Sequence, residues 1–525
     1  MKNNYMRAGL LTAIFAFSFM SCEDLADPII EDLDVDRAFA PTGLTARVRN
    51  LTTIELQWNV RDDADHYVVE FSDDSLEFAN IIRTVTVNRG DLPLQETFDG
   101  ETRYSARVKA VSALGKADSK WAAETVVTAR ENIFLPSQDG DIGALEAVVR
   151  WQPNAEVTHF IINPGNTERI ISADEKEVGA ATITGLTAET AYTVILRKDD
   201  KHRGQIQFET LLDIGNATAV HPEDDLAAVI AAASSGDVLV LFPGEYETNA
   251  GASILIDKSI TMRGLYPYDK PKLHVQFTIE NAGTSVEVRD LDLDGDGVLE
   301  DVFRFTTASV EFGAMNLIGC NVHDFKRSLV GANASSSKVL SLTIDNCIMT
   351  DMLTAGGDFI DFRNTHLGNL TIQNSTFDNC TPTRDFIRID GVAPTNGYSG
   401  TGLTTNVLID QCTLYGVSNN TGSNRRILYV RFDANAITVR NTIIAESSGI
   451  YTNQAGTSQP AFQKNNYFNA PRFFNSEFEV IANLKVDNSG THTALDPGFA
   501  DAAGGNFTIS NQTLKDNNVG DPRWR

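Results

Sequence analysis

Apolar residues recur in a fixed pattern in six segments of the second half of the chain. The segments align without gaps, and their first, third and eighth positions are apolar in every case. This spacing predicts a short strand, a bend, and a return of the chain to the same interior. Each segment is therefore expected to form one coil of a stacked β-helix. The segments are Val286–Leu293, Met315–Val322, Leu342–Met349, Leu370–Phe377, Val407–Leu414 and Ile437–Ile444.

The fifth position of these segments carries a residue suited to a sharp bend. It is Asp, Gly, Asn or Gln in all six segments, and such residues tolerate left-handed backbone or bond to nearby backbone groups. Stacking of the coils is expected to bring these side chains into a ladder. The sixth position holds Cys320, Cys347 and Cys412, which we interpret as small buried side chains, with disulfides as the alternative.

A short amphipathic helix is expected ahead of the coils. Residues 225–233 place apolar side chains at 226, 229, 230 and 233 on one face, and Asp224 is suited to cap the first turn. The backbone groups and apolar side chains of a first coil need such a cover. The helix is therefore predicted to close the start of the stack.

Alternating strands fill the region before the coils, in two copies. Residues 40–130 contain the strand signals 54–58 and 104–111, and residues 131–212 repeat the pattern. Both copies resemble fibronectin type III domains, whose core Trp and late-strand Tyr match Trp58 and Tyr104 in the first copy and Trp151 and Tyr192 in the second. The resemblance implies two small β-sandwiches, for which a spacer or platform role is preferred over ligand binding.

The N-terminal 22 residues have the layout of an export signal. Lys2 and Arg7 precede an apolar run, residues 10–20, that is too short to span a membrane and that ends at Ser21-Cys22. The segment resembles a bacterial lipoprotein signal, which implies lipidation of Cys22, and an ordinary cleaved signal is the alternative. The following Glu23-Asp24 resembles the surface-export tag of Bacteroidetes lipoproteins. The expected location is the outer membrane surface, with residues 23–39 as an acidic tether.

Residues 213–525 resemble the pectin-lyase-like right-handed parallel β-helices. The resemblance rests on the coils, on Gly236-Asp-Val and Pro243-Gly-Glu-Tyr246, and on Asp496-Pro-Gly-Phe and Gly520-Asp-Pro-Arg-Trp524, which are similar to domains of unknown function in Bacteroidetes lipoproteins. It implies an all-β chain of two sandwiches followed by the β-helix. The Arg-x-Pro-x-x-Arg motif of pectate lyases and the Gly-His-Gly of the glycosidase branch are absent, so no activity is carried over.

Charge narrows the range of partners. Lys and Arg total 43 against 70 Asp and Glu, which gives a formal net charge of −27. Such a surface repels nucleic acid and anionic lipid, so nucleic-acid binding is not expected. A local basic strip can nevertheless override the average charge.

Such a strip is predicted on the strand that follows each bend. Alternation in residues 302–306, 358–363, 385–390 and 427–433 turns the apolar residues inward and the polar residues outward. In register, Asp361 lies beside Arg388, and Asp390 lies between Arg363 and Arg431. Arginine binds uronate carboxylates, Tyr stacks on sugars and Asp accepts hydroxyl hydrogen bonds, whereas the alternative is a solubilising salt-bridge ladder. The predicted ligand-binding residues are Arg304, Asp361, Arg363, Arg388, Asp390, Tyr429 and Arg431.

An acidic segment suggests a calcium site. Residues 290–301 have the spacing of an EF-hand loop, with Gly295 in the sixth place, but the segment overlaps a coil and lacks flanking helices. The candidate ligands of Ca²⁺ are Asp290, Asp292, Asp294, Asp296 and Asp301. The histidines, among them His323 and His366, have no partner at metal spacing and are expected to face solvent in loops.

These features favour a cell-surface lipoprotein that binds an extended, acidic polysaccharide along the β-helix groove. Other glycan-uptake surface proteins are the expected partners. A polysaccharide lyase is one alternative, in which Arg388 and Arg431 neutralise a uronate and Tyr429 or an Arg removes the C5 proton. A structural or adhesive stalk is the other.

Overall fold

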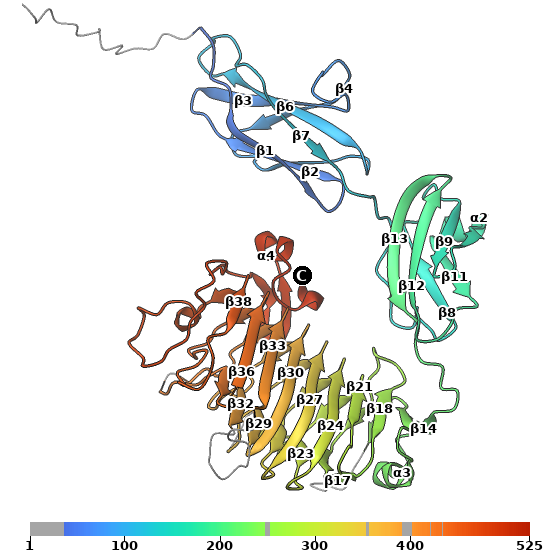
Figure 1. The fold of residues 1–525 in the computed structure, drawn as a ribbon. Helices are drawn as coiled ribbons and strands as arrows, with labels where there is room; N and C mark the ends of the chain where they lie inside the picture. Colours follow the sequence, from blue (N-terminus) through green and yellow to red (C-terminus); the bar gives the residue numbers. More distant parts are fainter. Residues whose placement is uncertain (1–35, 247–252, 353–355, 391–401, 421, 433) are drawn as a thin grey trace, which may run out of the picture. The chain divides into compact units, whose positions relative to one another are not determined.

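The computed structural model describes residues 36–246, 253–352, 356–390, 402–420, 422–432 and 434–525 (Figure 1). The predicted signal with Cys22 and most of the acidic tether lie outside these residues. The described chain is almost entirely β-strand, which confirms the predicted all-β class. Among the described residues, no helix combines the length and the apolar character needed to cross a membrane.

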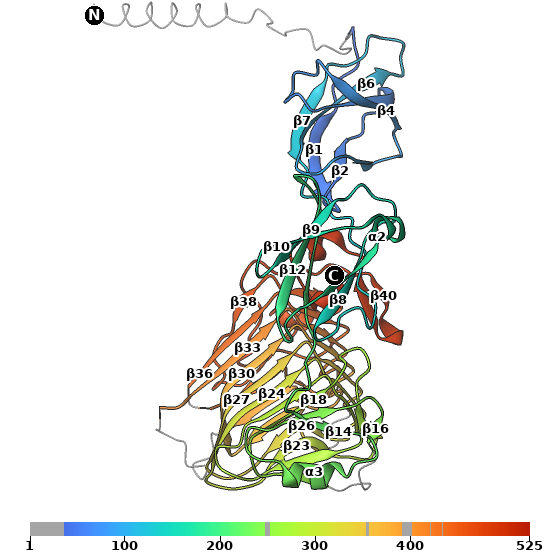
Figure 2. The ribbon, with the colours of Figure 1, turned by 90° about the vertical axis from the view of Figure 1, so that its right-hand side faces the viewer.

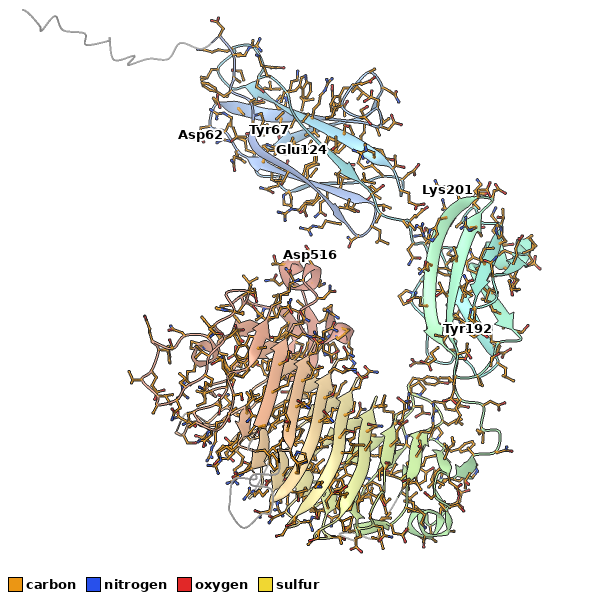
Figure 3. The ribbon with its side chains drawn as sticks, viewed as in Figure 1. Asp62, Tyr67, Glu124, Tyr192, Lys201 and Asp516 are labelled. Atoms are coloured by element: carbon orange, nitrogen blue, oxygen red, sulfur yellow. The ribbon has the colours of Figure 1, made fainter. Side chains whose placement is uncertain are left out.

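The first sandwich has a three-stranded sheet and a four-stranded sheet, both antiparallel. Its core contains the predicted Trp58, which packs edge-on against the fully buried Tyr67 with 5.3 Å between ring centroids. Tyr67 is labelled in Figure 3. Tyr104 is also buried, against Phe98. The sheets consist of β1 (Thr42–Arg49), β2 (Thr53–Asn59) and β5 (Leu94–Thr97), and of β4 (Ile81–Asn88), β3 (Ala64–Ser72), β6 (Arg103–Ser112) and β7 (Ala122–Val127).

The second sandwich also has a four-stranded sheet, but its other sheet has two strands. Trp151 is buried and packs against Phe160 with 5.5 Å between ring centroids, and Tyr192 is buried beside Phe208. One short helix, α2 (Ala173–Val178), is held by a capping box between Ser172 and Glu175. The strands are β10 (Thr167–Ile170), β9 (His159–Asn163), β12 (Ala191–Lys198) and β13 (Lys201–Glu209) in one sheet, and β11 (Ala180–Thr184) and β8 (Glu146–Arg150) in the other.

Three parallel sheets form the β-helix, and the coils in its middle contribute one strand to each sheet in turn (Figure 2). Sheet 1 contains β14 (Thr218–Val220), β15 (Val238–Leu241), β18 (Ile260–Gly264), β21 (Val286–Arg289), β24 (Glu311–Ile318), β27 (Ser337–Asp345), β30 (Thr365–Gln373), β33 (Thr404–Asp410), β36 (Ala434–Arg440) and β38 (Ala461–Gln463). Sheet 2 contains β16 (Glu245–Tyr246), β19 (Lys272–Leu273), β22 (Asp292–Asp294), β25 (Asn321–His323), β28 (Ile348–Thr350), β31 (Thr376–Asp378), β34 (Thr413–Tyr415), β37 (Ile443–Ala445) and β39 (Asn466–Phe468). Sheet 3 contains β17 (Ser253–Ile256), β20 (Gln276–Ile279), β23 (Asp301–Phe305), β26 (Ser328–Ala332), β29 (Ile360–Arg363), β32 (Ile387–Asp390) and β35 (Leu428–Val430).

A helix lies at the start of the stack, as predicted. Helix α3 (Leu226–Ala232) buries Leu226 and Ile230 in the core of the β-helix. Its N-cap is Asp225, which accepts a hydrogen bond from the backbone of Ala228, whereas Asp224 bonds to the backbone of His221 instead. The predicted cap was therefore one residue early.

The six aligned segments each run from sheet 1 into sheet 2, and the bend between the sheets is left-handed at the fifth position. The φ angles lie between 49° and 64° at Asp290, Gly319, Asn346, Asn374, Gln411 and Asn441. The bend side chains were expected to form a ladder, but two of them bond to aspartates instead. The side-chain amides of Asn374 and Asn441 donate to Asp345 and Asp410 of the preceding coil at 2.9 and 3.0 Å. The sixth-position cysteines are buried and free, and each thiol donates to backbone carbonyls.

The C-terminal residues run across sheet 2 and join several coils. They form β40 (Phe499–Asp501), β41 (Asn506–Ile509) and α4 (Gln512–Asp516), with 3₁₀ turns at Ala502–Gly504 and Pro522–Trp524; another 3₁₀ turn, Pro471–Phe473, follows β39. Asp521 accepts a hydrogen bond from Thr376, Arg523 donates to Asn346, and Arg525 donates to Gln411. The motif at residues 520–524 therefore has a structural role, because it ties bend residues of different coils together.

The left-handed bend makes a testable demand on its residue. An Ala at position 374 must adopt a conformation that costs an L side chain roughly 1–2 kcal/mol, whereas Gly adopts it freely. Both variants lose the hydrogen bond to Asp345. We expect Asn374→Ala to have a lower free energy of unfolding than Asn374→Gly, by about 1 kcal/mol in denaturant titrations. Equal stabilities of the two variants would show that the bend does not depend on its φ angle.

Candidate anion-binding site

One column of equivalent positions, which alternate with the core residues, runs along sheet 3. The strands pair in register, so Thr278, Arg304, Gly331, Asp361, Arg388 and Tyr429 occupy equivalent places on successive coils. The intervening residues, such as Phe303 and Phe305, are buried inside the coils. The alternation predicted from the sequence is therefore present, and Asp361 lies opposite Arg388 as expected.

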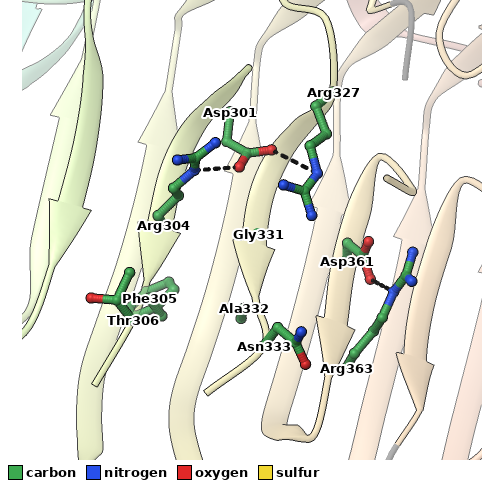
Figure 4. Close-up of a pocket in the computed structure, with 10 residues that line it drawn as sticks. All are labelled: Asp301, Arg304, Phe305, Thr306, Arg327, Gly331, Ala332, Asn333, Asp361 and Arg363. Carbon is green, nitrogen blue, oxygen red and sulfur yellow. Dashed lines mark hydrogen bonds and ion pairs between the residues drawn. The ribbon is translucent and has the colours of Figure 1, made fainter. Parts of the chain in front are cut away.

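A pocket of about 350 Å³ opens where this column reaches Gly331 (Figure 4). Glycine offers no side chain here, so the backbone of β26 forms the floor between Arg304 on β23 and Arg363 on β29. Arg327, which precedes β26, lines the pocket as well. Three arginines therefore line one depression of the sheet.

The three arginines differ in how tightly carboxylates hold them. Arg304 binds the buried Asp301 at 2.6 Å, and Arg363 binds the buried Asp361 at 2.7 Å. Arg327 has only long contacts, at 3.8 Å from Asp301 and 3.9 Å from Glu300. Its Nε and Asp301 Oδ1 are buried atoms with no hydrogen-bond partner among the described residues. Arg327 is thus the least neutralised cation of the pocket.

Beyond the pocket, Asp390 is held by arginines on two coils. Arg431 binds it at 2.8 Å and Arg388 at 2.9 Å. Arg363 is the register partner of Asp390, as predicted, but its ion pairs are with Asp361 and Asp358. Burial favours the neutral acid, but the hydrogen bonds from Arg431 and Arg388 hold the pKa of Asp390 below its ordinary value. The carboxylate therefore remains charged and fixes both guanidinium groups.

Two buried aspartates, which are not among the predicted site residues, lie just before strands of sheet 3. Asp358 and Asp385 occupy neighbouring coils and are buried. Asp358 pairs with Arg363, Arg384 and Arg388 at 3.2–3.4 Å, and Asp385 pairs with Arg426 at 3.0 Å. Burial, together with the charge of Asp358, raises the pKa of Asp385 despite Arg426. The repeated Asp-Phe-Ile at 358–360 and 385–387 was the available signal.

Three arginines surround the ring of Tyr429. The guanidinium carbons of Arg431, Arg388 and Arg426 lie 4.6, 4.8 and 5.0 Å from the centre of its ring. Cation–π attraction therefore makes the ring a support for the arginines. The sugar-stacking role expected for this ring stays a prediction.

The five predicted calcium ligands do not form one loop. Asp290 lies at the bend after β21, and burial raises its pKa. Asp301 lies on sheet 3 and binds Arg304, so it belongs to the pocket. Asp292, Asp294 and Asp296 lie together on or beside β22 of sheet 2. The EF-hand arrangement is wrong because consecutive strands of one coil carry these residues to different sheets.

The histidines also differ from expectation. His366 is buried on β30, where its ring packs against Phe432. His323 lies on β25, and Asp292, Asp294 and Asp324 surround it at 3.1, 3.5 and 2.7 Å. A second group joins His274 to Asp294 and Asp296. Lys272 binds the same Asp294 at 2.8 Å, so cations of the chain itself neutralise these carboxylates.

The environment of His323 predicts a pH-dependent stability. The hydrogen bond to Asp292 raises its pKa to about 9, with a smaller contribution from Asp324, although burial opposes the shift. A pKa raised above 6.5 stabilises the fold fully below pH 6.5, and this contribution disappears as the pH rises through 9. We expect the melting temperature of the protein to fall over this interval by more than that of His323→Asn. Parallel profiles for the two proteins would contradict the assignment.

Comparisons with known proteins extend this description in both halves of the chain. Residues 244–380 match a family described as a domain of unknown function (DUF4957), and residues 407–524 match another (DUF5123). No curated protein matches the chain. The two families therefore divide the β-helix but name no activity.

Among solved structures, the chain is similar to fibronectin type III proteins. A two-domain segment of chicken tenascin is 19% identical, with 33% of this chain and 99% of that one covered and a TM-score of 0.23. The FN1–FN3 domains of chicken CNTN1 are 16% identical, covering 33% and 64% with a TM-score of 0.15. The central fibronectin III array of RIM-binding protein is 20% identical, covering 37% and 67% with a TM-score of 0.15.

Proposed function

We propose that this protein binds an extended anionic polysaccharide, carrying uronate or sulfate groups, along the outer face of sheet 3. The observation that carries the proposal is the pocket over Gly331, which Arg304, Arg327 and Arg363 line in a chain of net charge −27. Guanidinium groups bind carboxylate and sulfate oxygens through charge-assisted hydrogen bonds. Arg327 makes only long ion pairs, at 3.8 and 3.9 Å, and is the group most available to a ligand anion.

The spacing of the arginines suits a linear polymer. Successive coils supply Arg304, Arg327, Arg363, Arg388 and Arg431, and neighbouring strands of a sheet lie ~4.8 Å apart. That step is about the length of one pyranose ring with its glycosidic oxygen. A glycan that runs along the helix axis would therefore meet a guanidinium group on each coil.

Buried carboxylates favour binding by keeping the arginines in place before the ligand arrives. Asp301, Asp358, Asp361 and Asp385 are nearly inaccessible, so they anchor guanidinium groups without competing for space at the surface. A fixed side chain loses less conformational entropy when it binds. The anionic ligand would then complete a network of alternating charges, with the pocket as its centre.

Binding is favoured over lyase chemistry by the state of the candidate bases. β-Elimination needs a group that accepts the C5 proton. The guanidinium groups of Arg388 and Arg431 are ion-paired, and Tyr429 is packed against three arginines. In this proposal the lipidated Cys22 anchors the protein to the outer membrane, the sandwiches act as a platform, and other surface proteins receive the glycan.

The pocket gives a specific test with polygalacturonate, sulfated dextran and neutral dextran as probes. We expect the soluble protein to bind one or both anionic polymers and not neutral dextran. Arg327→Gln should weaken this binding about tenfold, because it removes one charge-assisted contact worth ~1.4 kcal/mol. Its melting temperature should change little, since its ion pairs are long. Affinities are measured by calorimetry at low salt.

Arg289→Gln is the matched control, because it makes the same charge change on β21 of sheet 1, where Arg289 pairs with Glu287. This variant should bind as the wild type does. Equal losses in both variants would mean that net charge alone matters, and equal binding of neutral dextran would contradict the proposal. The appearance of unsaturated products, followed by ultraviolet absorbance, would replace binding with lyase activity.

A further inference from the structure

A second pocket, of about 420 Å³, lies near the last coils of the β-helix. It is lined by the loop that precedes β35, by Ser448 after β37, and by Arg472, Phe478 and Glu479 beyond β39. None of these residues lines the pocket over Gly331. The two pockets are therefore separate sites of the same domain.

The charge of the second pocket is balanced within its own lining. Arg472 is largely buried and donates to the carbonyl of Ser448 at 2.6 Å and to the side chain of Asn424. Glu479 neutralises the guanidinium group at 2.7 Å. A ligand with a net charge would disturb this pair, so the pocket favours a neutral molecule.

Two polar atoms of the lining lack a partner. Ser423 Oγ and Arg472 Nε are buried and make no hydrogen bond within the described part of the chain. Buried polar groups in folded proteins are nearly always hydrogen-bonded, and an isolated one marks a place that a ligand or a water molecule completes. Asn424 and Glu479 add further donors and acceptors to the same pocket.

An aromatic ring stands open beside these polar groups. Phe478 is 57% exposed although it is a large apolar residue, and it lines the pocket. A flat apolar ring next to hydroxyl, amide and carboxylate groups is complementary to a pyranose, which has an apolar C–H face and a rim of hydroxyl groups. The pocket volume is sufficient for a sugar unit.

We propose that this second pocket binds a neutral pyranose, stacked on Phe478 and hydrogen-bonded by Asn424 and Glu479. The inference rests on the proposed function only in the class of ligand, a saccharide. It adds a site whose chemistry differs from that of the arginines. A glycan that carries neutral units as well as acidic ones could then be recognised at two places.

Saturation-transfer NMR with neutral methyl glycosides of glucose, galactose, mannose, xylose and fucose tests the proposal on the soluble protein. At ~1 M NaCl the Debye length falls to about 3 Å, which suppresses binding to the arginines. We expect transfer to at least one glycoside and an at least tenfold weaker interaction in Phe478→Ala. Phe478 is exposed, so its truncation should leave the melting temperature unchanged.

Val480→Ala is the matched control, because Val480 is fully exposed in the same loop and does not line the pocket. Transfer should persist in this variant and in Arg327→Gln, which alters only the first pocket. The absence of transfer to all five glycosides, or its persistence in Phe478→Ala, would overturn the proposal. Loss of polyanion binding with retained glycoside binding would count against the proposed function alone.

Discussion

Hydrogen bonding between successive coils, in strict register, is the constraint on which the rest of the β-helix depends. A residue that faces outward on one strand of sheet 3 has its equivalent one strand spacing away on the next coil. Side chains far apart in the sequence, such as Asp361 and Arg388, are therefore neighbours. The same constraint stacks the left-handed bends and the small sixth-position residues into columns.

Electrostatics on sheet 3 follow from this stacking. Buried aspartates lie on these strands, as Asp301 does, or just before them, as Asp358 and Asp385 do. They form ion pairs with arginines that are only partly exposed. Ion pairs of this kind contribute little net stability once the cost of desolvation is included. Their effect is to fix cations at regular intervals on the surface of an acidic protein. At Gly331 the row lacks a side chain, and the resulting gap is the pocket.

The sequence predicts the fold well, because alternation and the recurring bend specify which residues face inward. It also predicts that Arg304 and Arg388 face outward, since they lie between buried neighbours. Asp358, Asp385 and Arg327 escaped prediction because they precede strands, where loop conformation rather than alternation sets direction. One contact of His323 could have been predicted from the repeat. Asp294 and His323 each directly follow one of two successive aligned segments, so stacking alone brings them together.

Packing between side chains decides the remaining features, and no local pattern reports it. Two carboxylates lie within reach of Arg363, Asp361 on its own strand and Asp390 on the next coil. Arg363 pairs with Asp361 rather than with Asp390. Nothing in the sequence indicated that Tyr429 would contact arginines, but three guanidinium groups lie near its ring. The second pocket is built from three separate stretches of chain, at residues 422–424, 448 and 472–479, and had no signal in the repeat.

The most direct test of the account is a crystal structure of the soluble protein with an oligogalacturonate. The account predicts that the sugar chain lies along sheet 3, with a carboxylate bound by Arg327 and by Arg304 or Arg363 in the pocket over Gly331. An oligogalacturonate bound on sheet 1 or sheet 2, with the pocket left unoccupied, would contradict it.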